Sequence, residues 1–169
     1  MEPRGRYHAG TTMSAREPVQ RTHFVGRATP VELYAIVTDF AAYPRLFPEF
    51  KQTRVVSTTG NVVRVEFRAE VVIAVRYVLD LACDAAALTV DWTFVEGEIV
   101  TGSTGGWRFI PSGDGTTIDY RAALDVKAPL PGFILRRVTD GLVSASLPAM
   151  FASIEREVRA RQARQARQT

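Results

Sequence analysis

The segment that starts at Thr29 constrains the fold most, because it predicts a helix that cannot continue. Thr29 suits an N-cap, Pro30 suits the first helical position, and Glu32 stands where a capping box places an acidic side chain. Pro44 and Pro48 follow within twenty residues and prevent a single long helix. The sequence therefore predicts a short helix, a turn and a second, very short helix.

Most of the remaining chain up to Pro129 is strand-like. Val63, Val65 and Phe67 alternate with charged residues, which is the period of a strand with one buried face. Similar patterns place strands at Val19–Ala28, Phe50–Ser57, Asn61–Ala69, 71–81, 90–94, around 102–109 and at 117–127. Tight turns, such as Gly113-Asp114-Gly115, join most of them and favour an antiparallel meander, since parallel neighbours need long crossovers.

A long helix is predicted at the end of the chain, from Pro131 to about Arg161. Apolar residues recur there at helical spacing, and Pro148 removes the hydrogen bond to the Ser144 carbonyl, which predicts a kink. The order of elements indicates an α+β fold. We expect a curved antiparallel sheet of about seven strands around this helix, with two short helices after the first strand.

One domain accounts for the chain, which has 169 residues and 46% hydrophobic content. We expect a flexible leader over residues 1–18, a ligand-binding domain over 19–161 and a basic tail over 162–169. The leader lacks the apolar core of a signal peptide, and the uncharged run Gly141–Ile154 is too short to span a bilayer. Cys83 is the single cysteine, which excludes an intrachain disulfide and a cysteine zinc site. A cytoplasmic protein without metal or cofactor is expected.

The basic charge is concentrated at the C-terminus. Residues 154–169 hold five arginines and two glutamates, which equals the net charge of +3 and leaves 16 basic and 16 acidic residues elsewhere. The body therefore lacks the electrostatics of a DNA-binding protein. The tail has two interpretations: a weak contact with anionic membrane or RNA, or a helix end whose cations suit the helix dipole.

Several short motifs resemble those of the START-like, helix-grip (SRPBCC) superfamily, in its coenzyme Q-binding and polyketide cyclase/dehydrase branch. The matching motifs are Ala28-Thr29-Pro30, Val37-Thr38-Asp39, Tyr43–Pro48, Gly106–Phe109, Gly115–Tyr120 and Pro129-Leu130-Pro131. The resemblance covers about 20–159. It implies a cavity between sheet and helix, in a family that includes lipid and quinone carriers, aromatic polyketide cyclases and a ribosome-association toxin.

Aromatic residues are the candidates for binding a ligand in this cavity, because pockets are mostly apolar with a few polar groups. The predicted ligand-binding residues are Tyr77, Trp92, Trp107, Tyr120, Tyr43, Phe47 and Phe151. The hydroxyls of Tyr77 and Tyr120 are expected to orient the ligand. A mobile apolar entrance is expected at Phe40, Tyr43, Leu46 and Phe47, with access between the long helix and the loops after the helix pair and after Gly113.

No catalytic set can be identified from the sequence. His23 is interpreted as a structural histidine rather than a pocket acid or base. Glu96 and Glu98 flank Gly97 and are interpreted as solvated turn residues rather than a proton-sharing pair. Glycines 102, 105 and 106 lie within a strand pattern and predict a bulge or a close backbone approach.

Three functions remain open. The first is a binding protein that carries or sequesters a hydrophobic small molecule, such as a lipid, a quinone or a polyketide. The second is an aromatase/cyclase-dehydratase that acts on a polyketide in the same cavity. The third is an interaction protein that uses its basic tail on a ribosome or a membrane.

Overall fold

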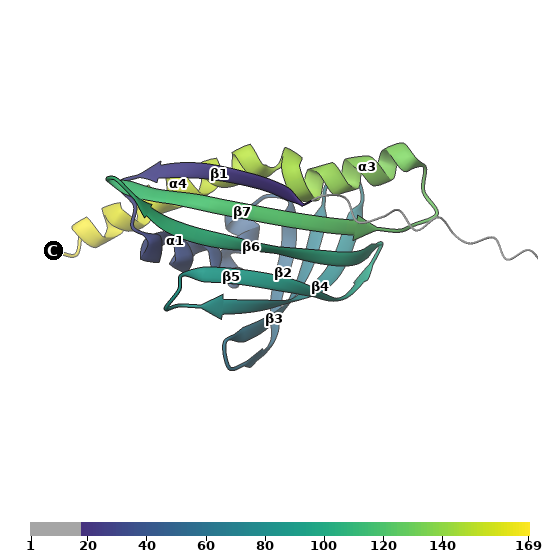
Figure 1. Ribbon diagram of the computed structural model, residues 1–169, viewed down its shortest axis with the longest axis horizontal. Coiled ribbons are helices and arrows are strands. Elements are labelled where there is room, and N and C mark those ends of the chain that lie inside the picture. The colour runs from purple at the N-terminus through teal and green to yellow at the C-terminus, as the bar shows by residue number, and fades with distance from the viewer. Residues whose placement is uncertain (1–17) are drawn as a thin grey trace, which may run out of the picture.

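The computed structural model describes residues 18–169, and the predicted leader lies outside this range except for Pro18. Figure 1 shows one curved sheet with a long, interrupted helix along it. The elements in chain order are β1 (Val19–Gly26), α1 (Pro30–Val37), η1 (Phe40–Ala42), α2 (Tyr43–Leu46), β2 (Phe50–Thr59), β3 (Val62–Glu70), β4 (Ala74–Asp84), β5 (Thr89–Glu98), β6 (Val100–Ser112), β7 (Gly115–Val126), α3 (Gly132–Asp140), the π-helical turn η2 (Gly141–Ala145) and α4 (Leu147–Ala166).

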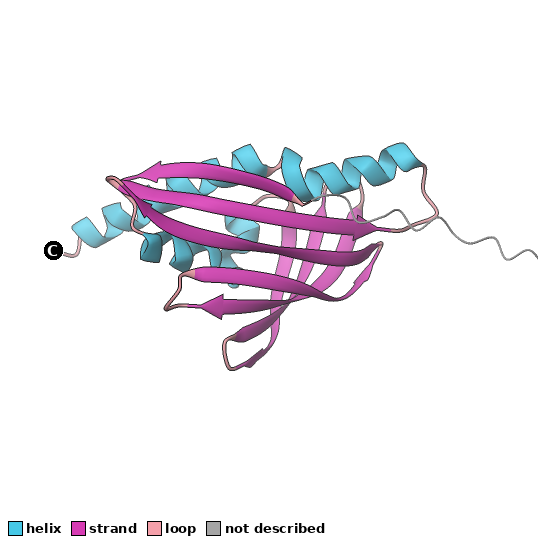
Figure 2. Cartoon of the chain, viewed as in Figure 1, coloured by secondary structure: helices cyan, strands magenta, loops and turns pink. Residues whose placement is uncertain are grey.

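The seven strands form one antiparallel sheet in the order β1-β7-β6-β5-β4-β3-β2. The strands β2 to β7 form the predicted antiparallel meander, whereas β1 pairs with β7 at one edge of the sheet rather than with β2. The helices lie on one side of the sheet, which curves around them (Figure 2). The alternation read from the sequence holds: Val65 and Phe67 are buried on the face toward the helices. The α+β helix-grip architecture is therefore confirmed.

The start of α1 has the predicted capping box. The Thr29 hydroxyl accepts a hydrogen bond from the Glu32 amide at 3.2 Å, and the Glu32 carboxylate accepts one from the Thr29 amide at 2.7 Å. The Tyr43 hydroxyl then donates to the Val37 carbonyl at 2.6 Å, which ties α2 to the end of α1. Phe47, at the end of this turn, is buried. The helix pair is thus part of the core.

The C-terminal helix differs from the predicted single kinked helix over Pro131–Arg161. It starts at Gly132, widens into the π turn η2, and resumes at Leu147. Pro148 lies in the first turn of α4, where the missing N–H costs no helical hydrogen bond, so the interruption falls before it. Gly141 packs so closely on Val71 of the β3–β4 loop that an added Cβ would overlap it.

α4 also continues past Arg161 to Ala166, so five of the eight residues of the predicted basic tail are helical. The Gln162 amide donates to the Arg27 carbonyl at 2.8 Å and to the Glu32 carboxylate at 3.1 Å. These bonds attach the helix end to the start of α1. Among residues 18–169, no helix is both long enough and apolar enough to cross a membrane.

Candidate functional site

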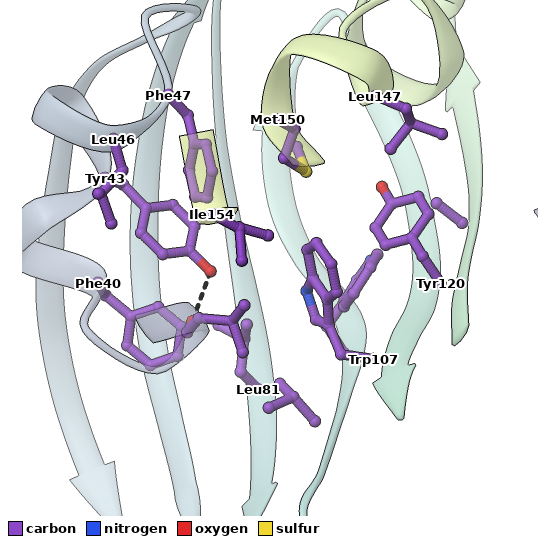
Figure 3. Close-up of a cluster of buried hydrophobic side chains, with 14 of the residues drawn as sticks. Phe40, Tyr43, Leu46, Phe47, Leu81, Trp107, Tyr120, Leu147, Met150 and Ile154 are labelled. Carbon is purple, nitrogen blue, oxygen red and sulfur yellow. Dashed lines mark hydrogen bonds between the residues drawn. The ribbon is translucent and has the colours of Figure 1, made fainter. Parts of the chain in front are cut away.

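A cavity lies between the sheet and the start of α4. The free space in the cavity is about 640 Å³, a value that includes space open to solvent. The centre of a water molecule can occupy about 80 Å³ of it. Figure 3 shows Tyr43, Trp107, Tyr120 and Met150 facing this interior from different elements. The lining residues are Tyr43, Phe47, Phe50, Phe67, Tyr77, Leu79, Leu81, Trp92, Ser103, Trp107, Tyr120, Ala122, Ala123, Leu124, Leu142, Val143 and Met150.

Six of the seven predicted ligand-binding residues line this cavity: Tyr43, Phe47, Tyr77, Trp92, Trp107 and Tyr120. Phe151 does not. Its ring is buried and stacks on the His23 ring, with centroids 4.6 Å apart. Helical spacing correctly predicted that Phe151 is on the buried face of α4. It does not indicate which strands that face packs against, and therefore not whether Phe151 reaches the cavity.

Strand register brings the aromatic residues together. Trp107 of β6 is directly opposite Tyr120 of β7, with ring centroids 4.7 Å apart, and Trp92 lies 6.0 Å from the same tyrosine ring. The Trp92 indole has room because its partner across the ladder is Gly105. A Cβ on Gly105 would overlap the indole and the Arg121 carbonyl. The predicted close backbone approach therefore occurs at Gly105.

The hydrogen-bonding groups of the cavity fall into two sets. The Tyr43 hydroxyl donates to the Val37 carbonyl, and the Trp92 indole N–H donates to the Ser103 hydroxyl at 3.1 Å. In contrast, the hydroxyls of Tyr77 and Tyr120 and the Trp107 indole N–H have no hydrogen-bond partner within residues 18–169. These groups are free to bond a ligand.

The electrostatics of the cavity favour an uncharged occupant. Burial raises the pKa of Tyr77 and of Tyr120, so both hydroxyls stay neutral and can donate hydrogen bonds. None of the lining residues carries a charge. Burying an unpaired charge among apolar side chains is costly, whereas a neutral polar group needs only a hydrogen-bond partner. The site therefore suits a neutral, largely apolar molecule with one or two polar atoms.

Glu49 is a residue that sequence reasoning missed. It stands in the chain between Phe47 and Phe50, two lining residues, and its Oε1 atom is buried without a hydrogen-bond partner among the described residues. Burial raises its pKa, and its charge in turn raises the pKa of Tyr77 and Tyr120. Nothing in its sequence context distinguishes it from a solvated glutamate at the start of a strand.

The other titratable candidates lie away from the cavity. His23 Nε2 is 2.7 Å from Glu155 Oε1 and His23 does not line the cavity, so its structural role stays a prediction. Glu96 and Glu98 are exposed at the end of β5 rather than in a turn, and Glu96 pairs with Arg76 at 2.9 Å. In the part of the chain that the structure describes, no cluster of three or more His, Cys, Asp or Glu side chains is arranged to hold a metal ion.

The predicted access route past Gly113 needs correction, whereas the mobile entrance at the helix pair stays a prediction. Phe40, Tyr43, Leu46 and Phe47 are all buried, and only Tyr43 and Phe47 line the cavity. The turn at Gly113 contributes nothing to the lining. It is joined instead to the loop between β1 and α1, where the Arg27 amide donates to the Asp114 carbonyl at 2.9 Å. The helical border of the cavity is formed by α2, η2 and the start of α4.

Comparison with known proteins agrees with this architecture. The sequence profile described as "Polyketide cyclase / dehydrase and lipid transport" matches residues 27–162. No curated protein sequence is similar enough to count as a relative. All of the structural neighbours described next share the fold at identities below 25%.

The structure of TTHA0849 from Thermus thermophilus superposes with a TM-score of 0.74 at 22% identity, covering 85% of this chain and 97% of that one. The Zhui aromatase/cyclase from Streptomyces sp. R1128 gives 0.76 at 16%, covering 86% and 94%. A START superfamily protein from Mycobacterium smegmatis gives 0.69 at 20%, covering 85% and 97%.

Proposed function

The chain belongs to the polyketide cyclase / dehydrase and lipid transport family, and we propose that its cavity binds an uncharged, largely apolar small molecule that the protein carries or sequesters. The observation that supports this most strongly is the lining itself. Aromatic and aliphatic side chains surround the space, while Tyr77, Tyr120 and Trp107 present neutral hydrogen-bonding groups that the protein leaves unpaired. Lipids, quinones and polyketide-like molecules all match this chemistry.

The volume of the cavity limits which ligands fit without movement of its walls. The space open to the centre of a water molecule, about 80 Å³, is narrow for a ligand with several rings. A larger ligand therefore requires the walls to move. Met150 is one wall element that adapts readily, since methionine has three rotatable bonds and fills irregular gaps. Leu142 and Val143 belong to the π turn, where the regular helical hydrogen bonding is interrupted.

Removing a cavity hydroxyl tests the orienting role of the tyrosines. We expect Tyr77→Phe or Tyr120→Phe to weaken binding of a quinone such as menadione by about 1 kcal/mol, or about fivefold, if the hydroxyl donates one hydrogen bond to a ligand carbonyl. Isothermal titration measures the affinity directly. N-phenylnaphthylamine has no carbonyl and serves as the matched ligand, which both variants should bind as the wild type does. If the wild type and both variants bind menadione with equal affinity, the hydroxyls of Tyr77 and Tyr120 do not orient the ligand.

An aromatase/cyclase is the second candidate, and Glu49 is the observation that favours it. Its Oε1 atom is buried without a hydrogen-bond partner among the described residues, and burial raises the pKa of the carboxyl, which favours the protonated form that a general acid needs. The test is incubation with a linear polyketide. Formation of a ring product by the wild type, and its loss in Glu49→Gln, would establish catalysis. If the wild type and Glu49→Gln both bind the polyketide and neither converts it, the carrier function is supported instead.

A further inference from the structure

A second concave site lies on the other side of α2 from the cavity. Tyr43 and Phe47 face the cavity, whereas Arg45, from the same turn, faces a cleft against the C-terminal part of α4. The centre of a water molecule can enter about 470 Å³ there, more than in the cavity. All lining residues are polar or charged: Asp39, Arg45, Glu157, Arg161, Arg164, Gln165 and Gln168.

Three guanidinium groups converge on one carboxylate in this cleft. Arg45 donates two hydrogen bonds to Glu157, at 2.9 and 3.2 Å, and Arg161 donates one at 3.0 Å. Arg164 approaches the same carboxylate at 3.6 Å. The Glu157 side chain is 5% exposed, but Arg45 and Arg164 are 61% and 54% exposed. Each guanidinium has five N–H donors, so most donors of Arg45 and Arg164 are left for a ligand.

The charges of the cleft leave it positive. Arg161 also bonds Asp39, at 3.2 Å, so three arginines face two carboxylates. The C-terminal end of α4 adds a partial charge of about −0.5. A positive balance of about half a charge remains, and Gln165 and Gln168 add uncharged amide groups at the rim.

We propose that this cleft binds a phosphate group. Arginine forks suit planar or tetrahedral oxyanions that accept several hydrogen bonds at once, and phosphate accepts more than a carboxylate does. The phosphate contacts Arg45 of α2 and Arg164 of α4, while the Glu157 carboxylate holds the guanidinium groups together and oriented. The bound phosphate then bridges the α1–α2 region and the helix end. The site is separate from the cavity and has no aromatic or aliphatic lining.

Titration with inorganic phosphate at constant ionic strength, followed by NMR of the arginine and glutamine side-chain N–H groups, tests this site. We expect saturable shifts for Arg45, Arg164 and Gln165, and about tenfold weaker binding in Arg164→Gln, which loses one charged donor. Arg167→Gln is the matched control, with the same charge change on the same end of the chain, and it should bind as the wild type does. Arg164 is exposed, so its variant is expected to fold.

Vesicles distinguish the source of the phosphate. Flotation with phosphatidylcholine vesicles that contain phosphatidic acid would show a lipid headgroup in the cleft if Arg164→Gln abolishes binding and Arg167→Gln does not. Saturation by inorganic phosphate without vesicle binding would indicate a small phosphorylated molecule. Two results overturn the proposal. One is an equal loss in both variants, which is non-specific charge attraction. The other is the absence of any saturable response to both phosphate and vesicles.

Discussion

Acidification is expected to remove about 3 kcal/mol of stability through a single residue, Glu157. The hydrogen bonds from Arg45, followed by those from Arg161, lower the pKa of this nearly buried carboxyl to about 2. The unfolded chain has the usual value near 4.5. Because the folded value is the lower one, the contribution is complete above the unfolded pKa and is lost as the pH falls through the folded pKa.

Urea denaturation of the wild type and Glu157→Gln as a function of pH measures this contribution. The wild type should be more stable by up to about 3 kcal/mol near pH 6, and the difference should disappear near pH 2. Glu155→Gln, on the same helix, controls for the loss of one charge. Its carboxylate is 30% exposed, so a smaller effect near neutral pH is expected. A difference between wild type and Glu157→Gln that stays constant with pH would contradict the assigned charge network.

Gly105→Ala is expected to destabilise the protein by about 3 kcal/mol, because overpacking a closed site forces neighbouring groups to move. The added Cβ overlaps the Trp92 ring and also the Arg121 carbonyl, and the backbone on that side is held in the β6–β7 ladder. The indole must shift, and the backbone at Arg121 must move as well. The hydrogen bond from the indole to Ser103 should break, and the cavity wall should change with it.

Thermal unfolding measures the stability, and the near-ultraviolet circular dichroism of tryptophan reports the indole. Gly132→Ala is the matched control, because nothing lies within 4 Å of the position where its Cβ would stand. We expect it to unfold at the wild-type temperature or slightly above. If Gly105→Ala retains both the stability and the tryptophan spectrum of the wild type, the close packing of Trp92 on β6 is wrong.

Most of this fold could be predicted from local patterns in the sequence. Alternation at Val63–Phe67 gives strand faces, because side chains alternate strictly along a strand. The capping box of Thr29 and Glu32 could also be predicted, because its two residues are only three positions apart in the sequence. Six of the cavity residues followed from strand parity and from the resemblance to the START-like superfamily.

Features that depend on contacts between distant segments could not be predicted. Arg45 and Glu157 are 112 residues apart, and no local pattern pairs them. Gly141, at the start of the π turn, packs against Val71, which is 70 residues away in the chain. Glu49 is distinguished only by burial of one oxygen atom, which requires the folded chain. The helical end of the chain lacks an apolar stripe, although its Ala, Arg and Gln residues are good helix formers.

Methionine-methyl NMR with a neutral apolar ligand tests the central proposal, binding in the cavity, most directly. Met150 lines the cavity and points from α4 toward Trp107 (Figure 3). The chain has three methionines, and the other two, Met1 and Met13, precede the domain. Labelled methionine methyl groups therefore give few signals, and Met150→Leu assigns the one in the cavity.

We expect N-phenylnaphthylamine to shift the Met150 signal through the ring current of the bound aromatic group, with saturation at one equivalent. The Met1 and Met13 signals should not move. Quenching of Trp92 and Trp107 fluorescence should follow the same binding curve, since both indoles line the cavity. A Met150 signal that stays unchanged while the probe binds elsewhere, or does not bind at all, would contradict the proposed ligand-binding function.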